Sequence, residues 1–248
     1  MKILPLSEGS FTIDSSKLFV PFDTSSDDLQ QRPVGSLLVE VQPFLLITGQ
    51  DIILIDTGLG FIDANGKPQI HNNLAEHGIN PGDITKVLMS HLHKDHAGGV
   101  SFEDTTAGTH VLNFPSARYY IQKQELEFAF EKGFPSYIPA ELESLKESPQ
   151  VVLLDNNKGV IDGYIQYEVT AAHSPYHQVF RIIEEGKQIF FGGDDAPQLQ
   201  QMKSRFVAKY DYDGRKCMEL RHQWWKQGEK EKWTFLFYHD IKSPVVEF

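Results

Sequence analysis

The chain has 248 residues, of which 40% are hydrophobic and 23% charged, and its 34 acidic and 23 basic residues give a formal net charge of −11 at pH 7. This composition is typical of a globular protein and excludes a disordered chain, while the acidic balance argues against nucleic-acid binding. The length fits one α/β or all-β domain. We therefore expect a single domain over residues 1–248.

The cysteine count and the apolar runs narrow the choice further. Cys217 is the only cysteine, which excludes an intramolecular disulfide and a paired-cysteine metal knuckle, so a tight metal site must use histidines and carboxylates. The apolar stretch within residues 1–14 is too short for a signal-peptide core, and no apolar run approaches the ~20 residues that span a bilayer. We expect a cytoplasmic protein without membrane contact. Whether it is a monomer or a homodimer stays open.

In the first half of the chain the pattern predicts a strand at the N-terminus, followed by a hairpin. The hairpin comprises residues 37–47 and 52–55, which flank a Gly-Gln turn. A short helix is predicted over residues 70–77, because Gly78 follows it as a usual helix-ending residue. The apolar run over residues 84–89 predicts a buried strand. Residues 24–33 are polar enough to predict a mobile loop.

The second half predicts two helices over one face, then mostly strands. The helices cover residues 121–132 and 140–147, and each is followed by a glycine or a proline. A further helix is predicted over residues 214–227, before a last strand over 234–238. Four more strands are predicted over residues 151–154, 164–170, 179–183 and 188–191. Trp224 and Trp225 fit an amphipathic helix packed on the core better than an RNA-binding surface.

Potential metal ligands are concentrated directly behind the predicted strand 84–89, in the run His91-Leu92-His93-Lys94-Asp95-His96. In an extended or tightly turned segment His91 and His93 point to one side and can bind one ion. Asp95 and His96, in the turn beyond, can then reach a neighbouring ion. The alternative is a solvated polar turn, but such a turn has no use for four ligands behind a buried strand.

This run resembles the HxHxDH signature of the metallo-β-lactamase-fold superfamily of metal-dependent hydrolases. Further motifs of that family follow in the expected order, each at a predicted strand end: Asp56-Thr57-Gly58, His173, Asp194 and His239. The resemblance covers about residues 35 to 240. It implies an α/β fold with four layers, αββα, in which two mixed sheets pack face to face and helices lie outside.

The resemblance also implies two divalent metal ions, with zinc ahead of iron or manganese for a site without thiolates. The pair would make hydroxide at neutral pH and polarise the attacked carbonyl or phosphoryl group. Asp194 would bridge the ions together with this hydroxide, and Asp95 would share the role of general base. The implied ligands are His91, His93 and His173 for one ion, and Asp95, His96 and His239 for the other.

Three aspartates near this site differ in their expected roles. Asp56 resembles the family's aspartate that orients the histidine loop, although a strand-terminal aspartate can also make an ordinary turn hydrogen bond. Asp194 and Asp195 are adjacent and face opposite ways if extended, so only one can bridge. Asp194 is the better candidate because the family pattern is a Gly-Asp pair that closes a strand. Asp195 is the alternative.

The stretch from Ser90 to Gly99 is most similar to N-acyl homoserine lactonase-like members of the family, which implies a small-molecule substrate. Those lactonases place a tyrosine soon after the bridging aspartate to assist the leaving group, and here Tyr210 or Tyr212 could substitute. Tyr176 stands in the His173 loop where the family has a glycine, and it either lines the pocket or fills space. Tyr176 and Tyr212 are therefore the candidate substrate contacts.

The sequence thus predicts a hydrolase that cleaves a lactone or another carboxylic ester. A phosphoester or thioester hydrolase of the same fold is the alternative, and so is a metal- or ligand-binding module without turnover. Several aromatic residues could roof the pocket or pack into the core instead. They are Tyr119, Tyr120, Phe128, Phe130, Phe134 and Tyr137.

Overall fold

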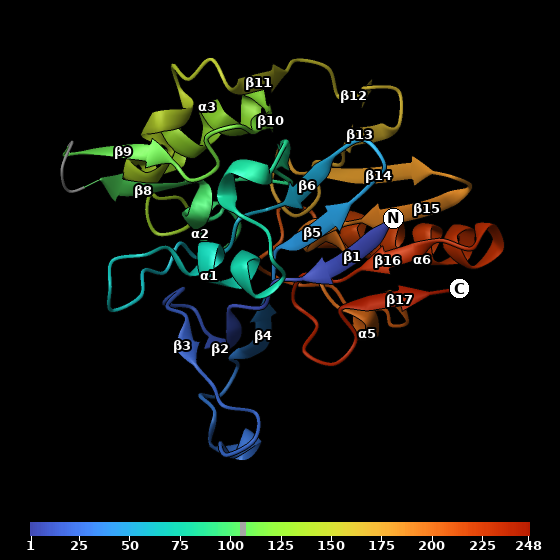
Figure 1. Cartoon of the computed structure of the whole chain (residues 1–248). Helices are drawn as coiled ribbons and strands as arrows, with labels where there is room; N and C mark the ends of the chain where they lie inside the picture. Colours follow the sequence, from blue (N-terminus) through green and yellow to red (C-terminus); the bar gives the residue numbers. More distant parts are fainter. Residues whose placement is uncertain (105–107) are drawn as a thin grey trace.

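Two six-stranded sheets pack face to face, and helices cover the outer face of each (Figure 1). The computed structural model describes residues 1–104 and 108–248. The four layers confirm the predicted α/β sandwich. Within the described residues, no helix is both long enough and apolar enough to cross a membrane.

The first sheet has the strand order β1-β5-β6-β7-β10-β11. Strand β5 pairs antiparallel with both β1 and β6, whereas β6, β7, β10 and β11 run parallel to one another. The loops that follow the parallel strands therefore meet at one edge. The strand bounds are Lys2–Pro5, Phe44–Ile47, Ile52–Ile55, Lys86–Leu88, Arg118–Gln122 and Val151–Leu154.

The second sheet has the order β12-β13-β14-β15-β16-β17 and is antiparallel except for the pair β15 and β16. The strand bounds are Lys158–Ile161, Ile165–Val169, Gln178–Glu184, Lys187–Phe191, Thr234–Leu236 and Val245–Glu247. The sequence analysis missed β12 and β17. Both are edge strands, and β12 has little hydrophobic signal because it contains a lysine and a glycine.

The α-helices form the outer layers, with α1 to α4 beside the first sheet and α5 and α6 beside the second (Figure 1). Their bounds are Gln69–Glu76, Lys94–Ala97, Lys123–Lys132, Pro139–Leu142, Leu199–Met202 and Gly214–Glu231. The helix predicted over residues 140–147 is thus α4 followed by a 3₁₀ turn. The 3₁₀ turns are η1 to η5, at Leu29–Gln31, Pro81–Asp83, Gly98–Val100, Glu143–Leu145 and Gly193–Asp195.

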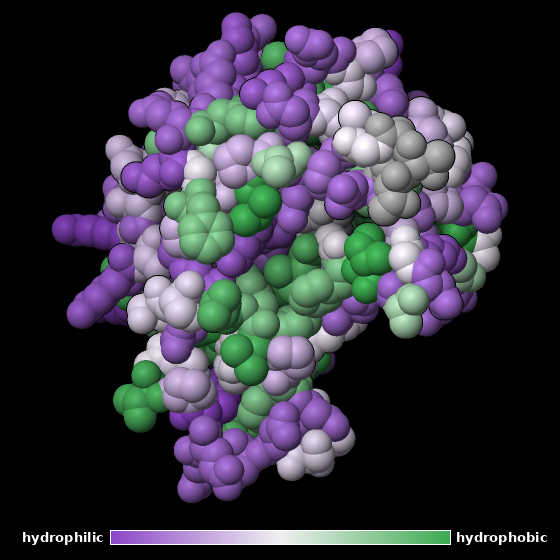
Figure 2. All heavy atoms as spheres, turned by 90° about the vertical axis from the view of Figure 1, so that its left-hand side faces the viewer, coloured by the Kyte–Doolittle hydropathy of each residue, from purple (hydrophilic) through white to green (hydrophobic). Residues whose placement is uncertain are grey.

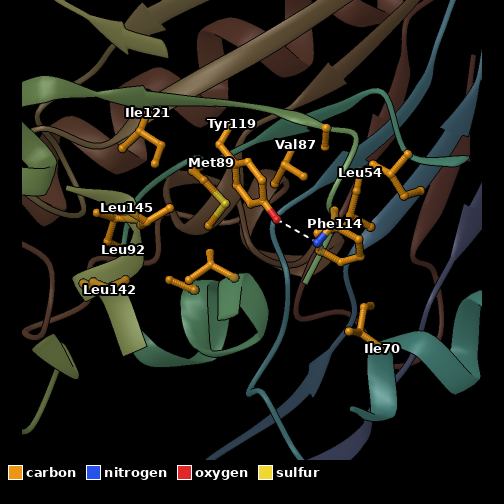
Figure 3. Packing of buried hydrophobic residues seen from close by; sticks show 14 of the residues in the cluster. Leu54, Ile70, Val87, Met89, Leu92, Phe114, Tyr119, Ile121, Leu142 and Leu145 are labelled. Carbon is orange, nitrogen blue, oxygen red and sulfur yellow. Dashed lines mark hydrogen bonds between the residues drawn. The ribbon is translucent and has the colours of Figure 1, made fainter. Parts of the chain in front are cut away.

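Alternation along the first sheet divides its side chains between two cores. Leu54 and Val87 face the helices, where Figure 3 shows them near Ile70 of α1 and the Tyr119 ring. The Tyr119 hydroxyl accepts a hydrogen bond from the Phe114 N–H (2.9 Å), which gives the phenol oxygen a partner within this apolar cluster. The residues that alternate with Leu54 and Val87 along these strands face the second sheet. They are Phe44, Leu46, Ile53, Ile55 and Leu88.

The outer face of the second sheet packs against α6. The ring of Trp224 lies 4.8 Å from that of Phe190, and the ring of Trp225 lies 5.6 Å from that of Phe235. The buried Arg221 donates hydrogen bonds to the carbonyls of Asp195 and Phe206. This helix therefore packs its tryptophans on the core, as predicted.

A smaller sheet projects from the body (Figure 1). It consists of β2 (Gly9–Ile13), β3 (Val20–Pro21) and β4 (Leu37–Val41). The single strand predicted over residues 37–47 was therefore wrong, because β4 and β5 belong to different sheets. Gln42, at the break, donates side-chain hydrogen bonds to the carbonyls of Phe237 and Asp240, and the proline that follows has no N–H to donate.

The surface view places hydrophobic residues in a hollowed band where the projection joins the body (Figure 2).

A two-stranded hairpin, β8 (Ser101–Asp104) and β9 (Thr109–Leu112), was also not predicted. Hairpins of this kind are short and half-exposed, so they carry little hydrophobic periodicity.

Candidate metal centre

Seven ligand-type side chains meet at one edge of the sandwich, each from a loop that follows a strand. Four of them follow β7 of the first sheet: His91, His93, Asp95 and His96. The other three follow β13, β15 and β16 of the second sheet: His173, Asp194 and His239. The two sheets thus contribute to one site.

The first group of ligand atoms belongs to His91, His93, His173 and Asp194, all within 4.8 Å of one another. His93 Nδ1 lies 2.9 Å from His91 Nε2 and 3.1 Å from His173 Nε2. Asp194 Oδ2 lies 3.3 Å from His173 Nε2. Nitrogens around one tetrahedral zinc ion, at about 2.0–2.1 Å from it, are separated by roughly 3.3 Å. This group has that spacing.

The second group belongs to Asp95, His96, Asp194 and His239. Asp194 Oδ1 lies 3.1 Å from both His96 Nε2 and His239 Nε2. Asp95 Oδ2 lies 3.7 Å from His96 Nε2 and 3.5 Å from His239 Nε2. Asp194 therefore turns one oxygen toward each group.

Asp195 lies behind this arrangement and belongs to neither group. Its side chain is fully buried, accepts the His173 backbone N–H (2.7 Å) and lies 3.1 Å from His177 Nδ1. His177 Nε2 in turn accepts the N–H of Asp194 (3.2 Å). The left-handed φ of Gly193 (+50°) turns the chain here, and a Cβ at that position would lie 2.6 Å from the His177 ring.

The Asp56 side chain fixes the segment that follows β7. Its carboxylate accepts both the N–H and the hydroxyl of Ser90 at 2.7 Å, and it lies 2.8 Å from His96 Nδ1. Nε2 of His96 is therefore the nitrogen directed at the second group. Asp56 itself has a positive φ of 55°, so it forms the turn as well as orienting the histidine.

Two other histidines are fixed in the same way. His173 Nδ1 lies 2.8 Å from Asp211 Oδ1, and His239 Nδ1 donates to the carbonyl of Glu40 (2.6 Å). Each ring presents Nε2 to the groups. The sequence analysis missed Asp211, which lies outside every motif.

Glu125 of α3 is a second residue that the sequence analysis missed. It is buried and accepts hydrogen bonds from the Leu92 N–H (3.0 Å) and from the hydroxyls of Tyr137 and Ser174 (3.2 Å each). Burial raises the pKa of its carboxyl group. Glu125 links the β7 loop to the loop that carries His173.

The electrostatics of the site favour a bound cation. Burial and the neighbouring histidines lower the pKa values of His91 and His93 well below the usual value, so both imidazoles are neutral at pH 7. Burial opposes ionisation of Asp194, but His239, His96 and His173 hold its pKa well below the usual range. Burial opposes protonation of His96, His173 and His239, but Asp194 raises the pKa values of all three. The carboxylate thus stabilises positive charge at the centre, which a bound cation would supply in place of these protons.

Two buried atoms also point to an additional partner. Within the described residues, His96 Nε2 and Asp194 Oδ1 are shielded from solvent and lie 3.1 Å apart, but neither atom makes a hydrogen bond. Buried polar atoms are normally satisfied, and these two face the centre of the second group. The residues present therefore fit a pair of divalent cations.

A cavity of about 740 Å³ opens over both groups, and Asp95, Asp194 and His239 are among its lining residues. Many of the other lining residues are apolar. They include Ile13, Phe19, Leu37, Val39, Phe206 and Val207.

The candidate tyrosines differ in their relation to this cavity. Tyr210 is among its described lining residues, with its ring 6.3 Å from that of His173, whereas Tyr176 and Tyr212 are not. Tyr176 packs against Phe128, with 5.8 Å between ring centroids. Tyr212 is 69% exposed, and its backbone N–H donates to the carbonyl of His173 (3.0 Å).

The suggestion that the aromatic residues between Tyr119 and Tyr137 roof the cavity was wrong, because none of them is among its described lining residues. Tyr119 and Tyr137 are buried, and Phe134 is 75% exposed. Tyr137 packs beneath His93, with 4.8 Å between ring centroids. The core-packing alternative therefore holds for most of these rings.

Solved structures with the same fold cover nearly the whole chain. One, described as a "probable metal-dependent hydrolase from Staphylococcus aureus", has a TM-score of 0.78 at 22% identity and covers 99% of this chain and 91% of its own. Another is AidC, a dizinc quorum-quenching lactonase, with a TM-score of 0.73 at 20% identity, covering 98% and 88%.

Sequence comparison agrees with the fold. The N-acyl homoserine lactonase AiiA of Bacillus thuringiensis subsp. kurstaki is 25% identical over 240 residues, which are 89% of each chain. The family model of the metallo-beta-lactamase superfamily matches residues 38–229. That match spans well over half of the chain, and the chain therefore belongs to the metallo-beta-lactamase superfamily.

Proposed function

We propose that this hydrolase cleaves a carboxylic ester, with a lactone as the first candidate, at a centre of two divalent cations. The single observation that carries the proposal is the pair of ligand groups that share Asp194 and open into one cavity. Zinc is the first candidate metal, ahead of iron and manganese, because the donors are imidazoles and carboxylates. When bound, the two cations would supply hydroxide at neutral pH and polarise the attacked carbonyl.

In this proposal the protein's own residues hold and orient the reactants. His91, His93 and His173 would hold one cation, while Asp95, His96 and His239 would hold the other. Asp194 belongs to both groups and would bind both cations. Asp95, which lines the cavity, is also placed to accept a proton from the attacking water.

The cavity wall supports an ester with an apolar portion. Phe19, Leu37 and Val39 line the same cavity as the metal groups, and apolar walls of this kind bind acyl chains. The relatives named N-acyl homoserine lactonase support a lactone. Tyr210 is the candidate to donate a hydrogen bond to the leaving oxygen, because it lines the cavity beside His173.

The test combines elemental analysis with a substrate panel, on protein purified without chelator or affinity metal. We expect about two metal ions per chain and chelator-sensitive hydrolysis, with lactones ahead of thioesters and phosphoesters. Asp194→Asn should lose at least about 100-fold in kcat and one equivalent of metal, since it removes the shared charge. Asp155→Asn is the control, because Asp155 is an exposed carboxylate outside the cavity.

Two results would contradict this proposal in different ways. Fewer than one metal ion per chain after addition of Zn²⁺, Mn²⁺ or Fe²⁺, with no turnover of any ester, would favour a binding module without catalysis. A preference for phosphoesters would keep the metal centre and reassign the substrate.

A further inference from the structure

Four basic side chains line the cavity in a protein whose net charge is −11. They are Lys17, Arg32, Lys94 and Lys209. Within the described part of the chain, none of the four forms an ion pair with a carboxylate, although the protein has 34 acidic residues. Three carboxylates, Asp14, Asp95 and Asp194, line the same cavity, but the last two belong to the metal groups. The four basic side chains therefore leave a local excess of positive charge, which attracts anionic ligands.

Two of these side chains lie together beside the metal groups. Lys94 stands between His93 and Asp95 in the sequence, and its ammonium donates a hydrogen bond to the carbonyl of Lys17 (2.6 Å). The ammonium of Lys17 donates to the hydroxyl of Ser136 (2.5 Å). An ammonium has three protons to donate, so both groups keep donors for a ligand.

The apolar wall extends from this basic pair. Phe19 follows Lys17 closely in the chain, and the Lys94 ammonium lies 5.8 Å from the centroid of its ring. Leu37, Val39 and Phe206 continue the lining. A ligand that fills the cavity would therefore meet the metal groups, the two ammonium groups and an apolar surface at once.

We propose that Lys17 and Lys94 bind an anionic group on the substrate, a carboxylate or a phosphate, while the apolar wall holds the chain that carries it. The substrate class is thus an anionic amphiphilic ester. This inference rests on the proposed ester hydrolysis, because it specifies the substrate of the same cavity.

The kinetic test compares two esters of equal chain length on the metal-loaded protein, the mono-4-nitrophenyl ester of adipic acid and 4-nitrophenyl hexanoate. We expect a higher kcat/KM for the anionic ester. The ratio of the two kcat/KM values should fall about tenfold or more in Lys94→Met and in Lys17→Met, since each loses a charge-assisted hydrogen bond.

Lys187→Met is the matched control, because Lys187 is an exposed lysine at the β14–β15 turn, outside the cavity, and its loss changes the net charge equally. In this variant the ratio should keep its natural value. An equal fall in Lys187→Met would assign the effect to net charge and overturn the inference. An unchanged ratio in both cavity variants would overturn it too.

A binding measurement separates this inference from the proposed function. Calorimetry with hexanoate, hexyl phosphate and hexanamide, on the natural protein and Lys94→Met, requires no turnover. At least one anion should lose about tenfold in affinity in the variant while hexanamide does not, and the anion with the larger loss identifies the group. If neither anion loses affinity in Lys94→Met, the metal ions bind the anionic group without the lysine, and the inference fails. If both esters resist hydrolysis, the proposed function fails, and this measurement still decides the inference.

Discussion

Three histidines of the candidate centre have one ring nitrogen fixed by the protein, so the other faces the ligand groups. Asp56 lies against Nδ1 of His96, and Asp211 against Nδ1 of His173. His239 Nδ1 donates to a backbone carbonyl. Such contacts set the tautomer and the ring orientation, and an anionic partner also raises the basicity of the ligand nitrogen.

Asp211→Asn should therefore weaken metal binding without removing a ligand. The amide can still accept the hydrogen bond from His173, but the negative charge is lost. We expect one equivalent of metal to bind about 10-fold or more weakly, measured by competition with a chromogenic chelator. Asp213→Asn is the control, because Asp213 caps α6 through the Lys216 N–H and asparagine caps as well. Equal affinities in both variants would contradict the role of Asp211.

The two tyrosines near this site should differ in kinetics. Partial burial of Tyr210, which is 48% exposed, raises the pKa of its phenol together with Asp211 and Asp194. The phenol therefore stays protonated at neutral pH and can donate a hydrogen bond to the leaving oxygen. Tyr210→Phe should lower kcat about 10-fold or more with little change in KM. Tyr212→Phe should match the natural protein, since its side chain is 69% exposed. A larger loss in Tyr212→Phe would reverse the assignment.

Glu8 should make stability depend on pH. Burial raises its pKa from 4.5 to about 7, opposed by the N–H of Leu59 and assisted by the negative charge of Asp95. A carboxyl group with a raised pKa in the folded state stabilises most below its unfolded pKa and loses that contribution as the pH rises through 7. The change corresponds to about 3 kcal/mol.

Replacing Glu8 by glutamine removes this ionisation. The free energy of unfolding of Glu8→Gln, relative to the natural protein, should therefore rise by about 3 kcal/mol between pH 4.5 and pH 8. Urea unfolding in chelator measures it without a contribution from bound metal. Glu76→Gln, on the exposed side of α1, is the charge-matched control. Parallel pH profiles for all three proteins would refute the prediction.

Sequence reasoning found the grouped ligand candidates because they form a motif with fixed spacing and order. It missed Asp211 and Glu125 for a physical reason. Asp211 contacts His173 across 38 residues of sequence, and Glu125 contacts Leu92 and Ser174 across 33 and 49. A glutamate in the first turn of a helix is normally solvated, so no local pattern marks it as buried.

At the level of elements, two loops at the site are held by direct backbone contact. The loop after β6 lies against α2 and η3 so closely that a Cβ on Gly98 would lie 2.4 Å from the carbonyl oxygen of Leu59. A Cβ on Gly99 would lie 2.1 Å from that of Thr57. The Thr57 N–H also donates to the His96 carbonyl (2.7 Å). This contact sets the position of α2, which carries Asp95 and His96.

Gly99→Ala should therefore separate the two loops. We expect a loss of about 2 kcal/mol or more in the free energy of unfolding, because a backbone carbonyl cannot give way as a flexible side chain can. Metal affinity should fall with it, since α2 moves. Gly82→Ala is the matched control, because Gly82 has no atom within 4 Å of its Cβ position and no positive φ. Equal denaturation midpoints for the two variants would show that the contact is unimportant.

Most predicted elements were right where burial imposes a clear pattern. The exception is β10, which is buried after Arg118 but was missed, because its last two residues were assigned to the helix predicted over 121–132. Strands β6, β7, β14 and β15 have mostly buried hydrophobic residues, and each was expected. Residues 37–47 are nearly as apolar, so hydrophobicity could not reveal that they divide between two sheets. The division depends on Gln42 and its partners near residue 240, which are distant in sequence.

For the molecule as a whole, the centre lies where the two sheets meet. The β7 loop supplies His91, His93, Asp95 and His96 from the first sheet. The second sheet supplies His173, Asp194 and His239. A cation held by ligands from both sheets binds the folded state alone, because unfolding separates those ligands. Metal binding should therefore stabilise the whole sandwich.

Removal of the metal should lower Tm in one cooperative transition. Free metal at 100 times its Kd adds about 2.7 kcal/mol to the free energy of unfolding, which for a chain of this size corresponds to roughly 5–10 °C. Calorimetry with zinc and with chelator measures this shift. Asp194→Asn should show a smaller shift, because that residue belongs to both ligand groups. An equal Tm with and without chelator would contradict the prediction that a bound cation stabilises the sandwich. Recovery of Tm on adding zinc back shows that the loss is reversible and arises from the metal.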